Sequence, residues 1–284
     1  MNTLIIIDGH NLLFRMFYGM PDRIIGADGK SVHAAVGFIG AVCNIINDLH
    51  PSHMVVLFDS EECGDRRSLS PEYKANRPDY SSMSEEECPF TQLPYIYRAL
   101  DEMGIAYSEV HGWEADDVIA SYALTYTGEP DIMLGIVSTD KDYYQLISEN
   151  VWVVQYSSRA IGYVSPDLLY AKYGIPPSLF ADFKCLIGDK SDNIPGAAGI
   201  GPKYAAELLR QFGSLDEIIA RRSEITRPSH RKSIEEAKDR LLLNRELILL
   251  KKEAPLPFDS FDELALTKLR WASASKVLRN AGVL

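Results

Sequence analysis

Three short apolar runs alternate with segments of helical periodicity in the first part of the chain. The runs Leu4–Ile7, Met54–Phe58 and Leu134–Ser138 are apolar and are bounded by turn-forming residues. Runs of this kind are typical of strands buried on both faces of a parallel sheet. The segments between them predict helices at Ala34–Leu49, Leu93–Met103, Ala115–Tyr126 and Tyr143–Ile147. This alternation predicts an α/β fold whose parallel sheet is flanked by helices.

The pattern changes after about Ser165, where the strand-like runs stop and short helical segments follow. We therefore predict two parts, an α/β core over residues 1–165 and a helical region over residues 166–284. The polar stretch from Asp59 to Pro94 is a long connection without a clear strand. Connections of that length are usually functional or mobile.

Composition places the chain among folded proteins, because 46% of its 284 residues are hydrophobic and 24% are charged. No apolar run approaches the roughly 20 residues that a membrane helix needs. The N-terminus reads as a first strand, since it reaches Asp8 without a basic leader. The four cysteines, Cys43, Cys63, Cys88 and Cys185, form no CxxC pair. That spacing argues against a disulfide scaffold or a zinc cluster and favours a reducing cytoplasm.

Charge is distributed unevenly along the chain. The net charge of −11 speaks against nucleic-acid binding. Residues 1–195, however, hold 13 basic and 28 acidic side chains, whereas residues 196–252 hold 12 basic and 8 acidic ones. An acidic metal site beside a basic binding module would produce this asymmetry, and so would two solvated faces of unequal charge.

Carboxylates follow each of the three predicted strands and open one helix. They are Asp8, Asp59, Glu114, Asp116, Asp117, Asp140 and Asp142. Ligands bind at the carboxyl ends of parallel strands, so we expect these acids at one edge of the sheet. Any one of them can be explained as a helix N-cap. So many carboxylates cannot share a site in ionised form unless cations neutralise them.

Oxygen-only ligand sets without His or Cys suit Mg²⁺ or Mn²⁺. Two such ions roughly 3.5–4 Å apart clamp the attacking and leaving oxygens of a phosphodiester, so its hydrolysis is the first hypothesis. Asp189 and Asp192 form a further acidic pair in the segment Gly188–Asn193. Metal binding and an Asx-turn after a helix at Phe180–Ile187 explain that pair equally well.

A glycine-rich segment follows this pair. Gly199 and Gly201 flank Ile200, Pro202 suits the first position of a helix, and Lys203 comes next. Glycines allow close approach of the backbone to a phosphate, and a helix N-terminus adds free N–H groups. The segment therefore predicts sequence-independent gripping of a nucleic-acid backbone, with a plain helix-turn-helix corner as the alternative.

On these motifs the chain resembles the structure-specific 5′-nucleases. This family comprises the 5′→3′ exonuclease domain of bacterial DNA polymerase I, its free-standing relatives and phage flap endonucleases. The resemblance runs from Leu4 to about Ala254. It rests on LIIIDGHNLLFRMFY, MVVLFD, the segment Pro71–Arg77 with Arg66 before it, GWEADDVIA, STDKDYYQL and GDKSDNIPGAAGIGPKYAAELL.

The resemblance implies a PIN-like core, a helical arch over residues 66–94 and a helix-three-turn-helix motif around residues 185–212. It implies a catalytic metal site built by Asp8, Asp59, Glu114, Asp116 and Asp117. A second ion site would be completed or bridged by Asp140, Asp142, Asp189 and Asp192. The cofactors would be two or more Mg²⁺ or Mn²⁺ ions, with K⁺ held by loop carbonyls of the glycine-rich segment.

The resemblance also implies roles for basic and aromatic residues. Lys74 and Arg77 would steer and polarise the scissile phosphate. The DNA contacts would come from Arg66, from Tyr73 stacking on a terminal base, and from Gly199, Gly201 and Lys203. The segment Pro78–Thr91 departs from expectation, because it contains four acids and no Lys or Arg and would repel a threaded strand.

The implied function is a metal-dependent 5′-nuclease that acts on DNA with a 5′ flap, 5′ overhang or nick, and on RNA-primed DNA. We expect a cytoplasmic monomer that works as a separate chain, since no polymerase domain follows Leu284. Two alternatives are a PIN-type RNase and a non-catalytic module that binds DNA junctions. The GDKSDNIPG and GIGPK motifs disfavour the first, and the complete acidic set disfavours the second.

Overall fold

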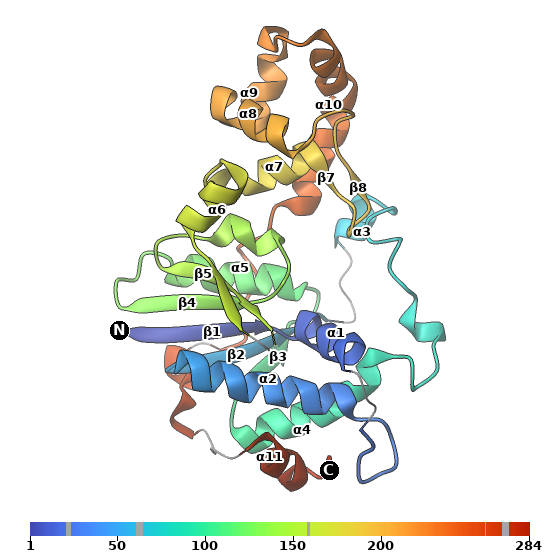
Figure 1. Ribbon diagram of the computed structural model, residues 1–284, viewed down its shortest axis with the longest axis vertical. Helices are drawn as coiled ribbons and strands as arrows, with labels where there is room; N and C mark the ends of the chain where they lie inside the picture. Colours follow the sequence, from blue (N-terminus) through green and yellow to red (C-terminus); the bar gives the residue numbers. More distant parts are fainter. Residues whose placement is uncertain (21–23, 61–64, 158–159, 259, 269–272) are drawn as a thin grey trace.

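A six-stranded sheet, with helices on both faces, forms the lower part of the computed structural model in Figure 1. The structure describes residues 1–20, 24–60, 65–157, 160–258, 260–268 and 273–284. The strand order of the sheet is β3-β2-β1-β4-β5-β6. The strands are β1 (Asn2–Asp8), β2 (His53–Phe58), β3 (Ala106–Glu109), β4 (Ile132–Val137), β5 (Val151–Tyr156) and β6 (Ile161–Val164). The first five run parallel, and only β6 pairs antiparallel, with β5.

Helices cover both faces of this sheet, as the alternation of apolar runs predicts. One face packs against α1 (Gly9–Gly19), α2 (His33–Leu49), α4 (Leu93–Met103) and α11 (Ala274–Asn280). The other packs against α5 (Ala115–Tyr126) and the 3-10 helix η3 (Asp142–Leu146). In β1, Ile5 and Ile7 enter the first of these cores, whereas Leu4 and Ile6 enter the second. A strand buried on both faces has to be apolar throughout, which explains the continuous run.

A helical region follows the sheet and lies at the top of Figure 1. It contains α6 (Pro166–Tyr173), α7 (Phe180–Ile187), α8 (Pro202–Phe212), α9 (Leu215–Ala220) and α10 (Pro228–Ile248). A short hairpin of β7 (Gly188–Asp189) and β8 (Ile194–Pro195) connects α7 to the loop before α8. The predicted parallel sheet and helical C-terminal region are therefore confirmed.

The two predicted parts of the chain pack against each other in the structure. Residues from the helical region share one hydrophobic core with β1, β4 and β5. The chain then returns to the sheet, where the Phe261 ring stacks on His53 with centroids 3.8 Å apart. The division at residue 165 stays a prediction, although β6 ends at Val164 and α6 begins at Pro166.

Three strands and one helix were not predicted from the sequence. Strands β3 and β6 are short and only partly buried, so they lack a continuous apolar run. Strand β5 and helix α1 also went unpredicted. Helix α1 starts immediately after β1, with Asp8 serving as its N-cap, so no loop separates the two elements.

The predicted helical arch differs from the structure. Between residues 65 and 92, the described helices are only α3 (Asp65–Leu69) and the 3-10 helices η1 (Tyr80–Ser82) and η2 (Pro89–Gln92). Pro71, Pro78 and Pro89 interrupt this segment, and proline removes a backbone donor and clashes with the preceding helical turn. The segment is therefore an arch of turns and extended chain.

Within the described residues, no helix is long and apolar enough to cross a membrane. Cys43, Cys88 and Cys185 are free thiols, and Cys63 lies outside the described residues.

Candidate active site

Carboxylates from four different elements meet at the carboxyl edge of the sheet. Asp8 is the last residue of β1, Asp59 directly follows β2, Asp140 follows β4 and Asp116 lies in the first turn of α5. Burial and the facing Asp59 raise the pKa of Asp8 to about 6. Burial, with Asp8 and Asp140 nearby, raises the pKa of Asp116 well above its usual range. The structure thus brings these four predicted ligands within electrostatic reach of one another.

Hydrogen bonds hold the first two of these acids in place. Asp8 Oδ1 accepts from the backbone N–H of Asn11 at 3.0 Å and caps α1. Asp59 Oδ1 accepts from the N–H of Ala115 at 2.8 Å, at the start of α5. The N-cap role is therefore confirmed for Asp8, and it is compatible with the predicted site role, because one oxygen caps the helix while the carboxylate lies near the other acids.

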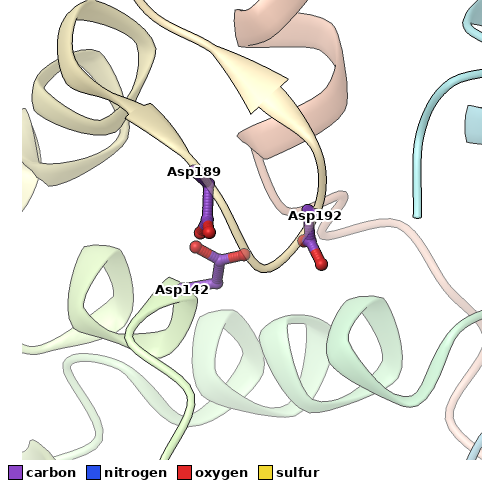
Figure 2. A group of neighbouring side chains, drawn as sticks. All are labelled: Asp142, Asp189 and Asp192. Atoms are coloured by element: carbon purple, nitrogen blue, oxygen red, sulfur yellow. The ribbon is translucent and has the colours of Figure 1, made fainter. Parts of the chain in front are cut away.

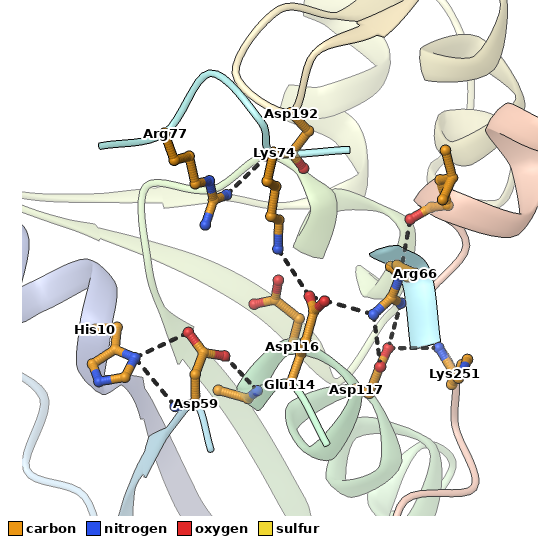
Figure 3. A network of polar contacts seen from close by, with 12 residues as sticks. His10, Asp59, Arg66, Lys74, Arg77, Glu114, Asp116, Asp117, Asp192 and Lys251 are labelled. Carbon is orange, nitrogen blue, oxygen red and sulfur yellow. Dashed lines mark hydrogen bonds and ion pairs between the residues drawn. The ribbon is translucent and has the colours of Figure 1, made fainter. Parts of the chain in front are cut away.

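His10 supports Asp59 and was not anticipated from the sequence. Its Nδ1 lies 3.0 Å from Asp59 Oδ2 (Figure 3). Burial opposes ionisation of Asp59, but the hydrogen bond and charge of His10 outweigh it and lower the pKa of Asp59 to about 2. The only available signal was the position of His10, two residues after Asp8.

A second group contains Asp142, Asp189 and Asp192. One carboxylate oxygen from each lies within 4.8 Å of the others (Figure 2). Asp142 comes from η3, while the other two come from the β7–β8 hairpin. Asp189 Oδ1 also accepts from the N–H of Ser191 at 2.8 Å. The Asx-turn and the clustering of acids are thus both present.

Lys184 of α7 lies against this second group. Its ammonium pairs with Asp142 and Asp189, and the residue is only 5% exposed. Burial opposes the charge of Lys184, but the two carboxylates outweigh it and raise its pKa. The sequence reasoning missed Lys184, because it sits in the largely apolar helix FADFKCLI with no motif of its own.

Both acidic groups fit a divalent cation of the Mg²⁺ or Mn²⁺ type. Their donors are oxygen atoms, which are the ligands that such hard cations prefer. A cation between carboxylates also relieves the repulsion that raises the pKa of Asp8 and Asp116.

Two cations from the base of the arch pair with acids of the site, and the space around these acids is called the acidic pocket below. Lys74 Nζ donates to Glu114 Oε2 at 2.9 Å, and Arg77 Nη2 donates to Asp192 Oδ1 at 2.8 Å (Figure 3). Lys74 has a φ of 55°, a left-handed conformation that is sparsely populated outside glycine. Its backbone N–H donates to Asp192 O at 3.0 Å. The β7–β8 hairpin therefore holds this backbone in place.

Tyr73 does not occupy the position predicted for it. Only 5% of the residue is exposed, and Lys74 Nζ lies 4.8 Å from the centre of its ring. A ring buried beneath Lys74 has no free face for a terminal base. We therefore assign Tyr73 to the support of Lys74 rather than to stacking on DNA.

Arg66 and Asp117 form a buried ion pair instead of reaching DNA and metal. They are 4% and 2% exposed, respectively. Arg66 Nη1 and Nη2 donate to the two carboxylate oxygens of Asp117 at 2.8 and 2.7 Å, and Nε donates to Leu247 O at 3.0 Å. Figure 3 shows Asp117 turned to Arg66, while Asp116 faces the pocket. Consecutive residues of a helix point about 100° apart, so the two side chains leave α5 in different directions.

This pair predicts a loss of stability when one partner is removed. We expect Arg66→Met to lower the free energy of unfolding by about 3–5 kcal/mol, because Asp117 keeps a buried, unpaired charge. Denaturant unfolding would measure the loss. The neighbouring Arg67 is exposed, so Arg67→Met is the matched control and should change little. If Arg66→Met is as stable as the wild type but binds DNA weakly, the original prediction that Arg66 contacts DNA is restored.

The glycine-rich loop leaves open space at its tip. A Cβ atom on Gly199 or Gly201 would meet no atom within 4 Å. Gly199 has a φ of 73°, whereas Gly201 has a φ of −87° that any residue can adopt. Lys203 is exposed in the first turn of α8. The loop is thus accessible to a phosphate, and only Gly199 requires glycine for its conformation.

Two models of one protein family together match nearly the whole chain. Residues 3–174 match the model described as the 5′-3′ exonuclease, N-terminal resolvase-like domain. Residues 175–272 match the model described as the 5′-3′ exonuclease, C-terminal SAM fold.

Curated relatives agree with these models. A 5′-3′ exonuclease from Streptomyces coelicolor is 35% identical over 269 residues, covering 89% of this chain and 87% of that protein. DNA polymerase I from Rhizobium leguminosarum is 36% identical over 273 residues, which cover 93% of this chain but 26% of the polymerase. The chain therefore spans about a quarter of that polymerase.

Solved structures share the fold over almost the full length. The T5 5′-exonuclease with bound zinc has a TM-score of 0.73 at 23% identity, covering 99% of this chain and 98% of the other. The bacteriophage T5 flap endonuclease in a complex with DNA and metal ions has a TM-score of 0.71 at 23% identity and the same coverage. The catalytic core of Rad2 with a DNA substrate has a TM-score of 0.60 at 13% identity, covering 99% and 93%.

Proposed function

The chain belongs to the 5′-3′ exonuclease family, and on that premise we propose that it is a metal-dependent, structure-specific 5′-nuclease. It hydrolyses phosphodiesters near the 5′ end of branched or nicked DNA in replication or repair. The observation that carries the proposal is the meeting of four carboxylates from four elements at one sheet edge, beside Lys74 and Arg77. The proposal extends to RNA-primed DNA, because primer ends present the same 5′ phosphodiester chemistry.

The metal ligands fall into two groups. Asp8, Asp59, Asp116 and Asp140 would hold one ion, and Asp142, Asp189 and Asp192 would hold a second. Bound Mg²⁺ or Mn²⁺ would lower the pKa of an attacking water and neutralise charge on the phosphate. Glu114 stays a predicted ligand of the first ion, and its carboxylate also pairs with Lys74 at 2.9 Å and with Arg66 at 3.4 Å.

Lys74 and Arg77 bind the phosphate that is cleaved. Both cations already face the acidic pocket, so the exchange of a carboxylate partner for a phosphate oxygen needs little movement. Positive groups aimed at an oxygen that gains charge stabilise the transition state more than the ground state. Lys184 partly neutralises the second group of acids, which would otherwise repel one another and the DNA.

The helical region holds the duplex away from the cleavage point. The β7–β8 hairpin links the loop before α8 to the base of the arch, because Asn193 Nδ2 donates to Glu72 O at 2.9 Å. The same hairpin also bonds to the backbone of Lys74, so the loop that would hold the duplex is tied to the segment that carries this cation. The arch acid Glu85 pairs with Lys30 at 2.8 Å, which partly offsets the negative charge of this segment.

The same proposal includes a K⁺ ion in the glycine-rich loop, a cytoplasmic location and a monomeric state. The loop carbonyls of Gly196 and Ala198 accept hydrogen bonds from Arg240 and Ser233. A carbonyl oxygen has a second lone pair, so these bonds leave each oxygen able to contact a cation.

The function is tested with a 5′-flap DNA, the matching intact duplex and a single strand of the flap sequence. We expect cleavage of the flap substrate in Mg²⁺ and none in EDTA. Equal cleavage of all three substrates would remove the structure-specific part of the proposal. Cleavage that persists in EDTA would overturn metal dependence, and flap binding without cleavage in Mg²⁺ or Mn²⁺ would favour a binding module.

Lys203 is predicted to contribute DNA affinity without entering the transition state. We expect Lys203→Ala to weaken flap binding and to lower the slope of log K against log salt by about 0.9, because one phosphate contact is lost. Single-turnover cleavage at saturating enzyme should hardly change, since such binding is uniform. The measurement is DNA affinity in Ca²⁺ over a KCl series. Lys276→Ala is the control, because Lys276 is an exposed residue of α11, which packs on the opposite face of the sheet.

Gly201→Val extends the same test. The Cβ of residue 201 meets no protein atom within 4 Å, so the variant should fold. We expect a larger loss of DNA affinity than for Lys203→Ala, because the branched side chain blocks approach of the phosphate to the backbone. If the salt dependence of DNA binding is unaltered in Lys203→Ala, or if Gly201→Val binds DNA with full affinity, the loop is only a turn between helices and does not bind DNA.

A further inference from the structure

Tyr143 places a single hydroxyl group between two of the site's carboxylates. It lies in η3, and its side chain is completely buried in the core that covers one face of the sheet. Its hydroxyl lies 3.1 Å from Asp8 Oδ2 and also bonds to Asp116 Oδ1. These acids come from the end of β1 and the first turn of α5, so the phenol connects two elements that build the site.

The hydrogen bonds to Asp8 determine which of its oxygens is available to an ion. Asp8 Oδ2 accepts from Ser138 Oγ at 3.0 Å and from Tyr143. A phenol has one hydrogen, so Tyr143 donates either to Asp8 Oδ2 or to Asp116 Oδ1 at any moment, while Ser138 donates to Asp8 Oδ2. Oδ1 accepts one bond, from the N–H of Asn11 at 3.0 Å, and keeps one site. Asp8 Oδ1, which has one hydrogen-bond contact where Oδ2 has two, is therefore the oxygen that would be more available to a cation.

Tyr143 also sets the separation of Asp8 and Asp116. Two carboxylates in a buried site repel each other and move apart unless something holds them. The phenol oxygen touches both, and the surrounding core prevents the ring from following either acid. The gap between the acids is thus set by a rigid neutral group before any ion enters.

We propose that Tyr143 is a positioning residue that holds Asp8 and Asp116 ready for the first divalent ion. This inference rests on the proposed function and deepens it. The hydroxyl contributes to ion affinity, whereas it makes no contact with the substrate. Groups that orient metal ligands typically change metal affinity or activity by about 10–100-fold when they are removed.

The test compares Tyr143→Phe with Tyr144→Phe. Tyr144 is adjacent and 1% exposed, but its hydroxyl accepts from Gln155 Nε2 at 2.8 Å instead of bonding to an acid. Each variant loses one buried hydroxyl group, so we expect both to lower the free energy of unfolding to a similar extent. A difference in metal binding between the two variants then cannot come from general loss of stability.

Metal affinity is measured by calorimetry with Mn²⁺ on the full chain without DNA. We expect Tyr143→Phe to weaken the tightest Mn²⁺ site by about tenfold or more, and Tyr144→Phe to bind as the wild type does. Ser138→Ala removes the other donor to Asp8 Oδ2 without touching Asp116, so it should show a smaller loss. That variant keeps the proposal testable if Tyr143→Phe is poorly folded.

Cleavage of flap DNA supplies a second readout. In Tyr143→Phe, the Mg²⁺ concentration at half-maximal rate should rise by about tenfold, while the rate at saturating Mg²⁺ stays within about threefold of wild type. Unchanged or tighter Mn²⁺ binding by Tyr143→Phe would overturn the proposal, as would a wild type that binds no Mn²⁺. A wild type that binds Mn²⁺ but cleaves no DNA would overturn the proposed function alone, because the calorimetry still tests Tyr143.

Discussion

Asp116→Asn is expected to lower the cleavage rate of a 5′ flap by a factor of about a thousand or more while DNA binding is retained. Asp116 lies close to several charged side chains, since its pKa is shifted by Asp8, Asp140, Asp59 and Lys74. An amide keeps the size of the side chain but removes a charge that holds the cation. Loss of about 4 kcal/mol of transition-state stabilisation is a thousandfold in rate. Removing negative charge near DNA reduces repulsion, so binding should survive or tighten.

The measurement is the single-turnover rate in Mg²⁺ together with DNA affinity in Ca²⁺. Asp140→Asn should behave like Asp116→Asn, because it belongs to the same group of acids. Asp131→Asn is the matched control, since Asp131 is exposed at the opposite end of β4 from the site. An Asp116→Asn rate within about threefold of wild type, a difference of less than 1 kcal/mol, would contradict the assignment of the site.

Lys74→Ala is expected to reduce the single-turnover rate by about 10²–10³-fold at saturating enzyme. Its ammonium faces the pocket and is held by Glu114 at 2.9 Å, with its side chain 13% exposed. A cation in such a sheltered position acts more strongly on a phosphate than one in bulk water. The effect should therefore appear in the chemical step and persist when all DNA is bound.

Lys190→Ala is the control for this experiment. Lys190 is exposed on the nearby β7–β8 hairpin, and only its backbone carbonyl bonds to Asn76, so truncation leaves that contact intact. Alanine is chosen over glycine at position 74 because the φ of 55° strains any residue with a Cβ, and glycine would relieve that strain. A rate defect that disappears at saturation would show that Lys74 contributes only to DNA binding.

Much of the fold follows from local patterns in the sequence. The predicted strands at Leu4–Ile7, Met54–Phe58 and Leu134–Ser138 correspond to β1, β2 and β4, which are the central strands of the sheet. A strand covered on both faces must be apolar along its length, so its pattern is unambiguous. The edge strands β3 and β6 are not predicted in this way, because a partly exposed strand can contain both polar and apolar residues.

The position of the site is also predictable from sequence. Parallel strands end at the same edge, so Asp8, Asp59 and Asp140 had to lie near one another once the strands were identified. Asp116 and Asp117 show the limit of that reasoning. The sequence places both in the first turn of α5, but only the packing of Arg66 decides that Asp117 faces inward.

The sequence by itself therefore determined the class of fold, the edge at which the acids gather and the family. These properties depend on backbone direction and on the period of apolar residues, which are local. The tertiary structure alone decided which side chains support the acids. His10 reaches Asp59, Tyr143 reaches Asp8, and Lys184 reaches Asp142, across 42 or more residues in each case. Such contacts depend on how distant segments pack, and no pattern within a single segment encodes them.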